Sequence, residues 1–221
     1  MTTQKLPGSD AARHGTGEAD LTIMLGAHAA FRRARQPHQV AAAFADLPDP
    51  VRRASVHAGW ETFKRQLHLH HTAEDAIVWP ALRQRLAHSE HAQSVLDAME
   101  AEHAQIDPLL AAVDDAFADA GRRSLGDRVG ALTTSLTAHL THEEHDGLPL
   151  IGVALTAAEW RGVGFKIARQ SGLSEAGEMF AWIADGADPD QAAAAIGTLP
   201  APARLIYRAF WKPRYRRTPR W

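Results

Sequence analysis

The side chains with the clearest capacity for chemistry stand in a pattern that occurs twice in this chain. His70 is followed four residues later by Glu74, and His139 is followed four residues later by Glu143. A proline follows each glutamate after six positions, at Pro80 and Pro149. Residues four apart on an α-helix differ by about 40° in direction and about 6 Å in height. Each histidine and its glutamate therefore share one helix face and can bind a common ion.

Two further histidines, His28 and His103, each lie within a stripe of apolar residues with helical spacing. A single buried histidine is more commonly held by hydrogen bonds than by a metal. Burying four histidines and two glutamates together is costly without charge compensation, which a pair of metal ions supplies. We therefore predict a metal site formed by six side chains: His28, His70, Glu74, His103, His139 and Glu143.

The absence of cysteine narrows the chemistry of this site. With no thiolate in the chain, zinc–thiolate sites, iron–sulfur clusters, disulfides and thiol catalysis are excluded. Any metal must bind nitrogen and oxygen ligands. Imidazole and carboxylate together admit iron, manganese or zinc, and helical bundles often hold pairs of iron or manganese ions in their cores. At this point the residues leave the choice of metal open.

Helices are the elements that must position these ligands. Apolar residues recur at helical rather than alternating spacing, and no stretch rich in valine, isoleucine and threonine has a period of two. The sequence thus predicts an all-α protein. Asp20 is a suitable N-terminal cap for a first helix that extends towards Gln36 and carries His28. A short helical piece is expected next, at about 39–45.

Three more long helices are predicted after this piece, with N-terminal caps at Asp49, Ser89 and Ser124. Their expected ranges are 50–86 with a kink or an end at Pro80, 89–119 with a kink at Pro108, and 124 to about 147–149. Four long amphipathic helices with short connections are typical of an up-and-down four-helix bundle. At about 1.5 Å per residue, the ligands in such a bundle fall within roughly 15 Å of one level.

Length and composition suggest one main domain with extensions. The chain has 221 residues, of which 45% are hydrophobic, and 12 of its 13 histidines lie between His28 and His145. We expect a flexible N-terminus at 1–19, the bundle at 20–152 and a helical extension at 153–221. No apolar run is long enough to span a membrane, and residues 1–19 lack the apolar region of a signal peptide. A cytoplasmic location is therefore expected.

The C-terminal extension reads as a set of shorter helices. Thr156 and Glu159 fit a capping box, and helices are expected at 160–169, 174–184, 188–196 and from 201. From Gln191 onward there is no acidic residue, while arginines alternate with aromatic and aliphatic side chains. Such an element can lie on an anionic membrane or a nucleic acid. We favour docking of its aromatic face against the bundle, with no nucleic-acid partner.

At the predicted ligands the sequence resembles the hemerythrin-like (HHE cation-binding) family. The match covers about Leu21 to Ile151: a lone histidine, then His-His-x-x-Glu-Asp with Trp-Pro, then Glu-His, then His-x-x-His-Glu-Glu. The resemblance implies two iron ions joined by an oxo or hydroxo bridge, with an open position for O2, peroxide or nitric oxide. It also implies four histidine ligands and two bridging glutamates: His28, His70, His103, His139, Glu74 and Glu143.

The resemblance is incomplete on the third helix. Oxygen-carrying hemerythrins have two histidines four residues apart there, whereas Met99 and Asp107 flank His103 at that spacing. Asp107 and His71 are the two candidates for the missing ligand. Three nearby polar residues either orient the ligands or are solvated: Asp75, His142 and Glu144. Surface positions are expected for five histidines: His38, His57, His88, His91 and His145.

Three functions fit these observations. The first is a di-iron protein that turns over a small oxidant, by peroxide decomposition or by reaction with nitric oxide or O2, in oxidative or nitrosative stress defence. The second is a protein that binds or senses O2 or iron without turnover and signals through the extension. The third is a metal-free interaction bundle. Having one histidine fewer than the oxygen carriers favours turnover over reversible O2 carriage.

Overall fold

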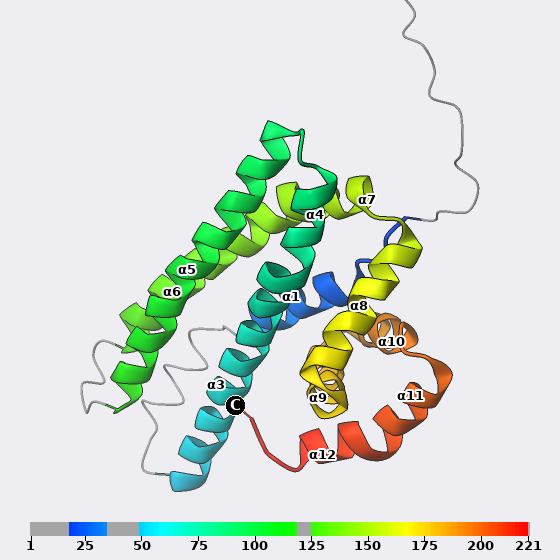
Figure 1. The fold of residues 1–221 in the computed structure, drawn as a ribbon. Helices are drawn as coiled ribbons and strands as arrows, with labels where there is room; N and C mark the ends of the chain where they lie inside the picture. Colours follow the sequence, from blue (N-terminus) through cyan, green and yellow to red (C-terminus); the bar gives the residue numbers. More distant parts are fainter. Residues whose placement is uncertain (1–17, 35–48, 119–124, 221) are drawn as a thin grey trace, which may run out of the picture.

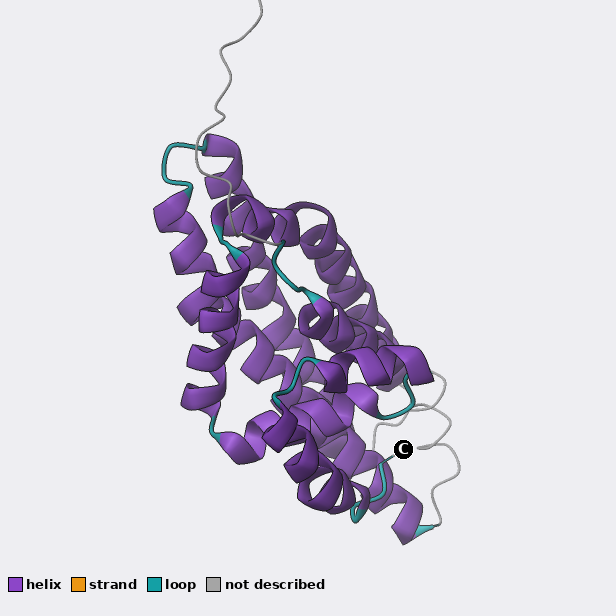
Figure 2. Ribbon diagram, turned by 90° about the vertical axis from the view of Figure 1, so that its right-hand side faces the viewer, coloured by secondary structure: helices purple, strands orange, loops and turns teal. Residues whose placement is uncertain are grey.

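The computed structural model describes residues 18–34, 49–118 and 125–220. Every regular element in these ranges is helical, and they contain no strand, as Figure 2 shows. The predicted all-α class is confirmed. Several expectations fall outside the described ranges: the flexible N-terminus up to residue 17, the helical piece at 39–45, the surface position of His38 and the cap at Ser124.

Four long helical segments form the predicted up-and-down bundle. The first is α1 (Thr22–Ala34), where a carboxylate oxygen of Asp20 accepts a hydrogen bond from the backbone N–H of Thr22 at 3.0 Å. Asp49 and Ser89 accept hydrogen bonds from the starts of the second and third segments in the same way, at 2.9 and 3.2 Å. The remaining elements are α3 (Pro50–Ala73), η1 (Glu74–Val78), α4 (Trp79–Arg85), α5 (Glu90–Ala118), α6 (Leu125–His142), η2 (Glu143–Gly147) and α7 (Leu148–Ala154).

A π-helical turn precedes the proline of each repeated motif. In η1 the backbone N–H of Trp79 donates to the carbonyl of Glu74, and in η2 that of Leu148 donates to the carbonyl of Glu143. Each turn accommodates one extra residue directly before the proline, which has no N–H to donate. The helix can therefore continue. The prediction that the fourth helix ends near residues 147–149 is wrong, because it continues as α7 to Ala154.

Proline also fails to interrupt the other long helices. After η1 the second segment resumes as α4 and reaches Arg85, close to the predicted limit at Leu86. Helix α5 runs through Pro108 as one element of 29 residues. Long, continuous helices are thus available on both sides of each ligand, which gives the ligands a rigid support.

Two apolar clusters lie above and below the polar ligands along the bundle. One contains Leu67 and Leu136, which precede the ligands on α3 and α6, and the other contains Trp79 and Leu148, which follow them. All four side chains are at most 2% exposed. Burial of large apolar side chains on both sides stabilises the bundle and holds the polar residues between the clusters away from water.

The C-terminal extension consists of short helices beside the bundle (Figure 1). Thr156 and Glu159 form the predicted capping box at the start of the first of them. The helices are α8 (Ala157–Ser171), α9 (Leu173–Ala184), α10 (Pro189–Gly197), α11 (Ala201–Ile206), η3 (Tyr207–Trp211) and α12 (Lys212–Arg216). In the part of the chain that the structure describes, no helix is both long enough and apolar enough to cross a membrane.

Aromatic side chains dock the extension on the bundle, and Tyr207 and Tyr215 of the basic C-terminal segment belong to the shared cluster, as expected for its aromatic face. Trp182 of α9 packs against Phe31 of α1, with ring centroids 4.8 Å apart, and both belong to the same buried cluster. At Gly177 the ring of Trp211 comes so close that a Cβ atom would lie 2.3 Å from it. Only glycine permits this approach. The bundle and the extension therefore share one apolar core.

Candidate metal centre

The described residues contain two groups of buried side chains whose ligand atoms lie within 4.8 Å of one another. One group comprises His28, His70, Glu74 and Glu143, and the other comprises His71, His103 and His139. All seven side chains are at most 7% exposed. The structure thus brings together all six side chains predicted from the sequence and adds His71 to them.

Within each group, histidine nitrogens face one another. The Nε2 atoms of His28 and His70 are 3.2 Å apart, and the Nε2 atoms of His103 and His139 are also 3.2 Å apart. In each pair, at most one of the two nitrogens can donate a proton to the other when both rings are neutral. Nitrogen atoms that converge in this way form the arrangement that a metal ion needs around it.

Each glutamate of the first group also approaches a histidine of the second. Glu74 is 3.1 Å from Nε2 of His70 and 3.6 Å from Nε2 of His103. Glu143 is 3.1 Å from Nε2 of His28 and 3.8 Å from Nε2 of His139. Each carboxylate therefore approaches one histidine of each group.

Three of the histidines are held by a second carboxylate at Nδ1. Glu144 lies 2.9 Å from His28, Asp75 lies 2.8 Å from His103, and Glu102 lies 2.8 Å from His139. An Nδ1–H that donates to a carboxylate leaves the lone pair on Nε2, the atom that faces the centre of the group. These contacts fix both the tautomer and the orientation of the ring.

Each supporting carboxylate is adjacent to a ligand in the sequence but accepts a hydrogen bond from a histidine on another helix. Glu144 follows Glu143 and reaches α1, while Asp75 follows Glu74 and reaches α5. Arg32 holds Glu144 in turn, at 2.6 and 3.0 Å. The structure therefore shows that Asp75 and Glu144 contact ligand histidines and are not merely solvated.

Glu102 was included in the family motif in the sequence analysis without being given a role, and Arg32 was not singled out there. Glu102 accepts hydrogen bonds from both His139 and His142, at 2.8 and 2.7 Å, so His142 also belongs to the supporting network. The only sign of such a role in the sequence is that Glu102 is adjacent to the ligand His103, as Asp75 is adjacent to the ligand Glu74. Of the histidines expected at the surface, four lie in the described ranges and all are exposed: His57, His88, His91 and His145.

His71 of α3 lies beside His103, whose own helix α5 carries no second histidine at the ligand spacing. Its ring is stacked on that of His103, with centroids 3.9 Å apart, and its Nε2 atom is buried without a hydrogen-bond partner. Asp107 is exposed and belongs to neither group. His70 and His71 are neighbours on α3, and successive helical residues point about 100° apart. One helix can therefore supply a histidine to each group.

The electrostatics of the centre favour a bound cation. Burial lowers the pKa of His70 and His71, and the neighbouring histidines lower it further, so that both imidazoles are neutral and able to bind a metal at neutral pH. Burial raises the pKa of Glu74 well above its ordinary value, and the charge of Glu143 adds to the effect. Two neighbouring buried carboxylates oppose each other's ionisation unless positive charge lies between them.

When no metal ion is bound, His28 is protonated at both ring nitrogens and forms a charged pair with Glu144; a metal ion at Nε2 would displace the proton there. Burial disfavours the charged form of His28, but the negative charges of Glu143 and Glu144, and the hydrogen bond that His28 donates to Glu144, raise its pKa to about 9. The hydrogen bond from His28, together with Arg32, lowers the pKa of Glu144 to about 2. Glu144 therefore stays ionised and can hold the His28 ring in place.

Several buried polar atoms of the centre have no hydrogen-bond partner, and this indicates whether the residues suit a metal. Both carboxylate oxygens of Glu74 and both of Glu143 are buried without a hydrogen-bond donor, and so is Nε2 of His71. Buried polar groups are normally paired, and leaving several of them together unpaired is costly. A set of nitrogen and carboxylate ligands with no thiolate fits iron, manganese or zinc. The residues therefore fit metal ions at this position.

A polar cavity reaches the centre from the surface between α3 and α5. It has a volume of about 240 Å³, and both His71 and His103 line it. Asp75 and Asp107 lie along its wall as well, with His68 beside them. Its volume is below the range of roughly 300–1,000 Å³ typical of sites for drug-sized ligands. The cavity thus offers small molecules an approach to the three-histidine group.

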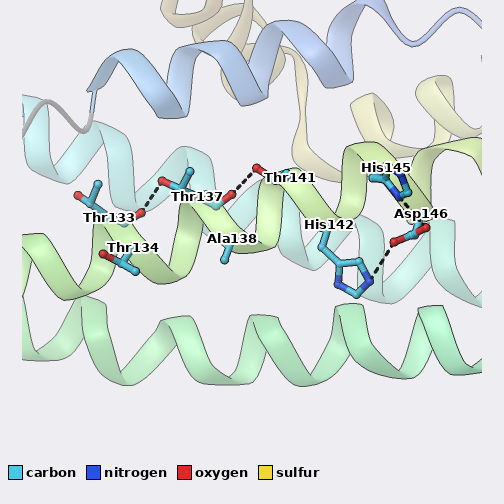
Figure 3. A pocket seen from close by; sticks show the side chains of 8 residues that line it. All are labelled: Thr133, Thr134, Thr137, Ala138, Thr141, His142, His145 and Asp146. Atoms are coloured by element: carbon cyan, nitrogen blue, oxygen red, sulfur yellow. Dashed lines mark hydrogen bonds and ion pairs between the residues drawn. The ribbon is translucent and has the colours of Figure 1, made fainter.

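A second, shallower groove follows the outer side of α6 (Figure 3). Its threonine hydroxyls donate to backbone carbonyls one turn earlier: Thr137 to Thr133 at 2.6 Å and Thr141 to Thr137 at 2.8 Å. Among the groove residues, His142 also belongs to the hydrogen-bond network of the metal centre. His142 and His145 each approach Asp146, at 3.4 and 2.9 Å, but the three side chains do not form a group compact enough to hold one ion, and we assign the groove no chemistry.

Fold and site together define a helical-bundle protein with a buried histidine–carboxylate centre suited to metal ions. Comparison with known proteins agrees with this class. Residues 19–151 match the family described as hemerythrin HHE cation binding domain, and the chain belongs to that family. Searches of curated proteins and of solved structures found no match. The resemblance read from the sequence motifs, with bounds near Leu21 and Ile151, is confirmed.

Proposed function

We propose that this protein binds two iron ions between its four long helices, one at each histidine group. One observation supports the proposal most directly: Glu74 and Glu143 each approach one histidine of the first group and one histidine of the second. With His71 included, the centre offers five histidines and two carboxylates, so the number of histidines no longer favours turnover over reversible O2 carriage. An imidazole-rich set suits iron better than manganese, which prefers oxygen ligands. The hemerythrin-like motifs favour iron over zinc.

We further propose that the centre reacts with a small oxidant, either hydrogen peroxide or nitric oxide and O2, as part of oxidative or nitrosative stress defence. Bound iron would supply the one-electron chemistry. The small cavity beside His71 and His103 supports a substrate of this size. The chain itself holds three imidazoles by their carboxylate partners and keeps the ligand atoms buried. Buried, fixed ligands limit competing reactions with water.

A second candidate function, sensing of O2 or iron without turnover, is favoured by one contact. Phe31 packs against His70, with centroids 5.2 Å apart, and against Trp182 of the extension at 4.8 Å. A single side chain thus links the metal centre to α9. A change in the position of His70 would be transmitted to the extension through two aromatic contacts.

Elemental analysis and an optical spectrum of the aerobically purified protein test the first proposal. We expect two iron ions per chain and charge-transfer absorption that changes when peroxide or nitric oxide is added. Oxygen release or consumption of nitric oxide over many turnovers would support the enzyme, and stoichiometric binding alone would support the sensor. If no metal binds even after anaerobic reconstitution with ferrous iron, the protein is a metal-free interaction bundle and the proposal fails.

A further inference from the structure

The element formed by α11, η3 and α12 presents two different faces. Tyr207, Trp211 and Tyr215 face inward, where they pack into or against the core cluster that the extension shares with the bundle. A π turn like those at the metal centre keeps the element continuous, because the N–H of Lys212 donates to the carbonyl of Tyr207 directly before Pro213. The inner aromatic face therefore fixes this element firmly to the rest of the protein.

Large apolar side chains remain on the opposite side. Leu205 is 66% exposed, Ile206 41% and Phe210 69%, all within six residues of one another. Isolated exposed apolar residues are common, but a cluster rimmed by charges marks an interaction site. Burying these side chains would remove apolar area from water, so a partner surface is expected to cover them.

The same element carries a dense positive charge. From Gln191 to the C-terminus the chain has seven basic residues and no acidic one: Arg204, Arg208, Lys212, Arg214, Arg216, Arg217 and Arg220. Since the whole chain has a net charge of −2, this segment contributes +7 and the remainder −9. Among the described residues only Arg220 of these seven pairs with a carboxylate, that of Glu178. The other six have no ion pair among the described residues, and five of them are exposed, while Lys212 is half-buried.

We propose that this outer face, residues 201–217, binds the surface of an anionic phospholipid membrane. Leu205 and Phe210 would enter the headgroup region while the neighbouring arginines contact the lipid phosphates. The exposed aliphatic side chains favour a lipid surface over a nucleic acid, which would use the cations and aromatic rings alone. The element is amphipathic, and it lies along the outer edge of the extension, on the side away from α5 and α6 (Figure 1).

The uneven distribution of charge would stabilise an orientation in which the basic face of the extension lies against the membrane. The acidic remainder of the protein is repelled by the anionic surface, but salt screens charges beyond about 8 Å at physiological ionic strength. The acidic residues that contact this element do so on its inner side, where Asp185 accepts a hydrogen bond from the buried Tyr215 and Glu178 pairs with Arg220. Binding should therefore weaken as the salt concentration is raised.

Vesicle co-sedimentation of the full-length protein tests the proposal. We expect binding to vesicles of equimolar phosphatidylcholine and phosphatidylglycerol and none to phosphatidylcholine alone. Phe210→Ser and Leu205→Ser should each reduce the bound fraction. Phe165→Ser is the matched control, because Phe165 is 67% exposed on α8, outside this face. It should bind as the unaltered protein does.

A charge variant gives an independent reading. Arg204→Glu with Arg208→Glu should weaken binding to anionic vesicles by about 25-fold or more, since each arginine near such a surface contributes roughly fivefold. Arg161→Glu with Arg169→Glu makes the same change of charge on α8 and should have a much smaller effect. Circular dichroism checks that every variant is folded.

Three results would overturn the proposal: no binding to anionic vesicles, equal binding to both kinds of vesicle, or equal loss in the test and control variants. If the protein instead bound a single-stranded oligonucleotide and not vesicles, the face would be a nucleic-acid site. If Phe210→Ser dissociated a dimer seen in sedimentation velocity, with no vesicle binding, a second copy would be the occupant. Neither outcome depends on the metal centre.

Discussion

The imidazole of His71 lies flat against that of His103, with centroids 3.9 Å apart and planes within 10° of parallel. The two rings come from α3 and α5, and together with His139 they form one of the two ligand groups. Unlike His103, His71 has a buried Nε2 atom with no hydrogen-bond partner. Stacking alone does not satisfy this atom, whereas a metal ion would.

His71→Ala should therefore reduce the metal content from two ions per chain to about one. The three-histidine group would keep only His103 and His139, while the other group would retain all four of its side chains. Elemental analysis after anaerobic reconstitution measures the change. His68→Ala is the control, since His68 is exposed on the same helix and lines the same cavity. Retention of both ions by His71→Ala would exclude it as a ligand.

Asp75→Asn should weaken metal binding by about 10- to 100-fold, as is usual when the partner of a metal-bound histidine is altered. The amide no longer stabilises the Nδ1–H of His103, which Asp75 contacts at 2.8 Å. Competition with a chelator gives the affinity. Glu100→Gln serves as the comparison, because Glu100 lines the same cavity but pairs with Arg83. Equal affinities for both variants would argue against an orienting role for Asp75.

Gly147→Ala should disturb the position of Glu143. A Cβ atom at Gly147 would lie 3.2 Å from Cγ of Glu143 and 3.5 Å from the sulfur of Met99, so the glutamate must shift by a few tenths of an ångström. We expect altered charge-transfer absorption of the iron-loaded protein and a loss of stability of about 1–3 kcal/mol.

The matched control for that change lies on the same helical segment. Gly152 has no atom within 4 Å of a Cβ built on it, so Gly152→Ala should leave the spectrum unchanged. Its stability should rise by up to about 1 kcal/mol, because alanine favours the helix over glycine. Identical spectra for both variants would show that Glu143 tolerates the added methyl group.

Gly177→Ala should loosen the contact between the extension and the bundle. The added carbon would lie 2.3 Å from the ring of Trp211, which must move out of its place against the core. Denaturant unfolding should give a free energy lower by about 1–3 kcal/mol. Gly162→Ala, on the exposed side of α8, meets no atom within 4 Å and should not lose stability. A loss of the same size in both variants would contradict the proposed close contact.

Glu159→Gln should change how stability depends on pH. The hydrogen bond from Arg85, with those from Thr156, lowers the pKa of Glu159 from 4.5 to about 2 in the folded protein. Because the folded pKa is the lower one, Glu159 stabilises the protein above pH 4.5, and this contribution is lost as the pH falls towards 2. The variant lacks this titration.

Melting temperatures measured across that range provide the check. The unaltered protein should lose more stability than Glu159→Gln between pH 4.5 and about 2. Glu90→Gln, at the exposed start of α5, should follow the unaltered protein. Parallel curves for Glu159→Gln and the unaltered protein would show that the capping box is not held by an ionised carboxylate.

Much of the centre could be predicted because its main features are local. His70 and Glu74, like His139 and Glu143, share a helix face by virtue of the helical repeat alone, whatever surrounds them. Capping at Asp49 and at Thr156 follows from the preference of short polar side chains for exposed N–H groups. The absence of cysteine likewise restricts the ligands to nitrogen and oxygen, however the helices pack.

Tertiary structure decided the rest, because it depends on the rotation and height of packed helices. The supporting pairs Asp75–His103, Glu102–His139 and Glu144–His28 are 28, 37 and 116 residues apart in the chain. No repeat in the sequence indicates that residues so far apart in the chain are in contact. The packing of one helix against the next brings them together. The same packing places His71, and not Asp107, in the second ligand group, and it brings Trp182 against Phe31. The sequence alone had already determined that a histidine–glutamate centre would form on helices.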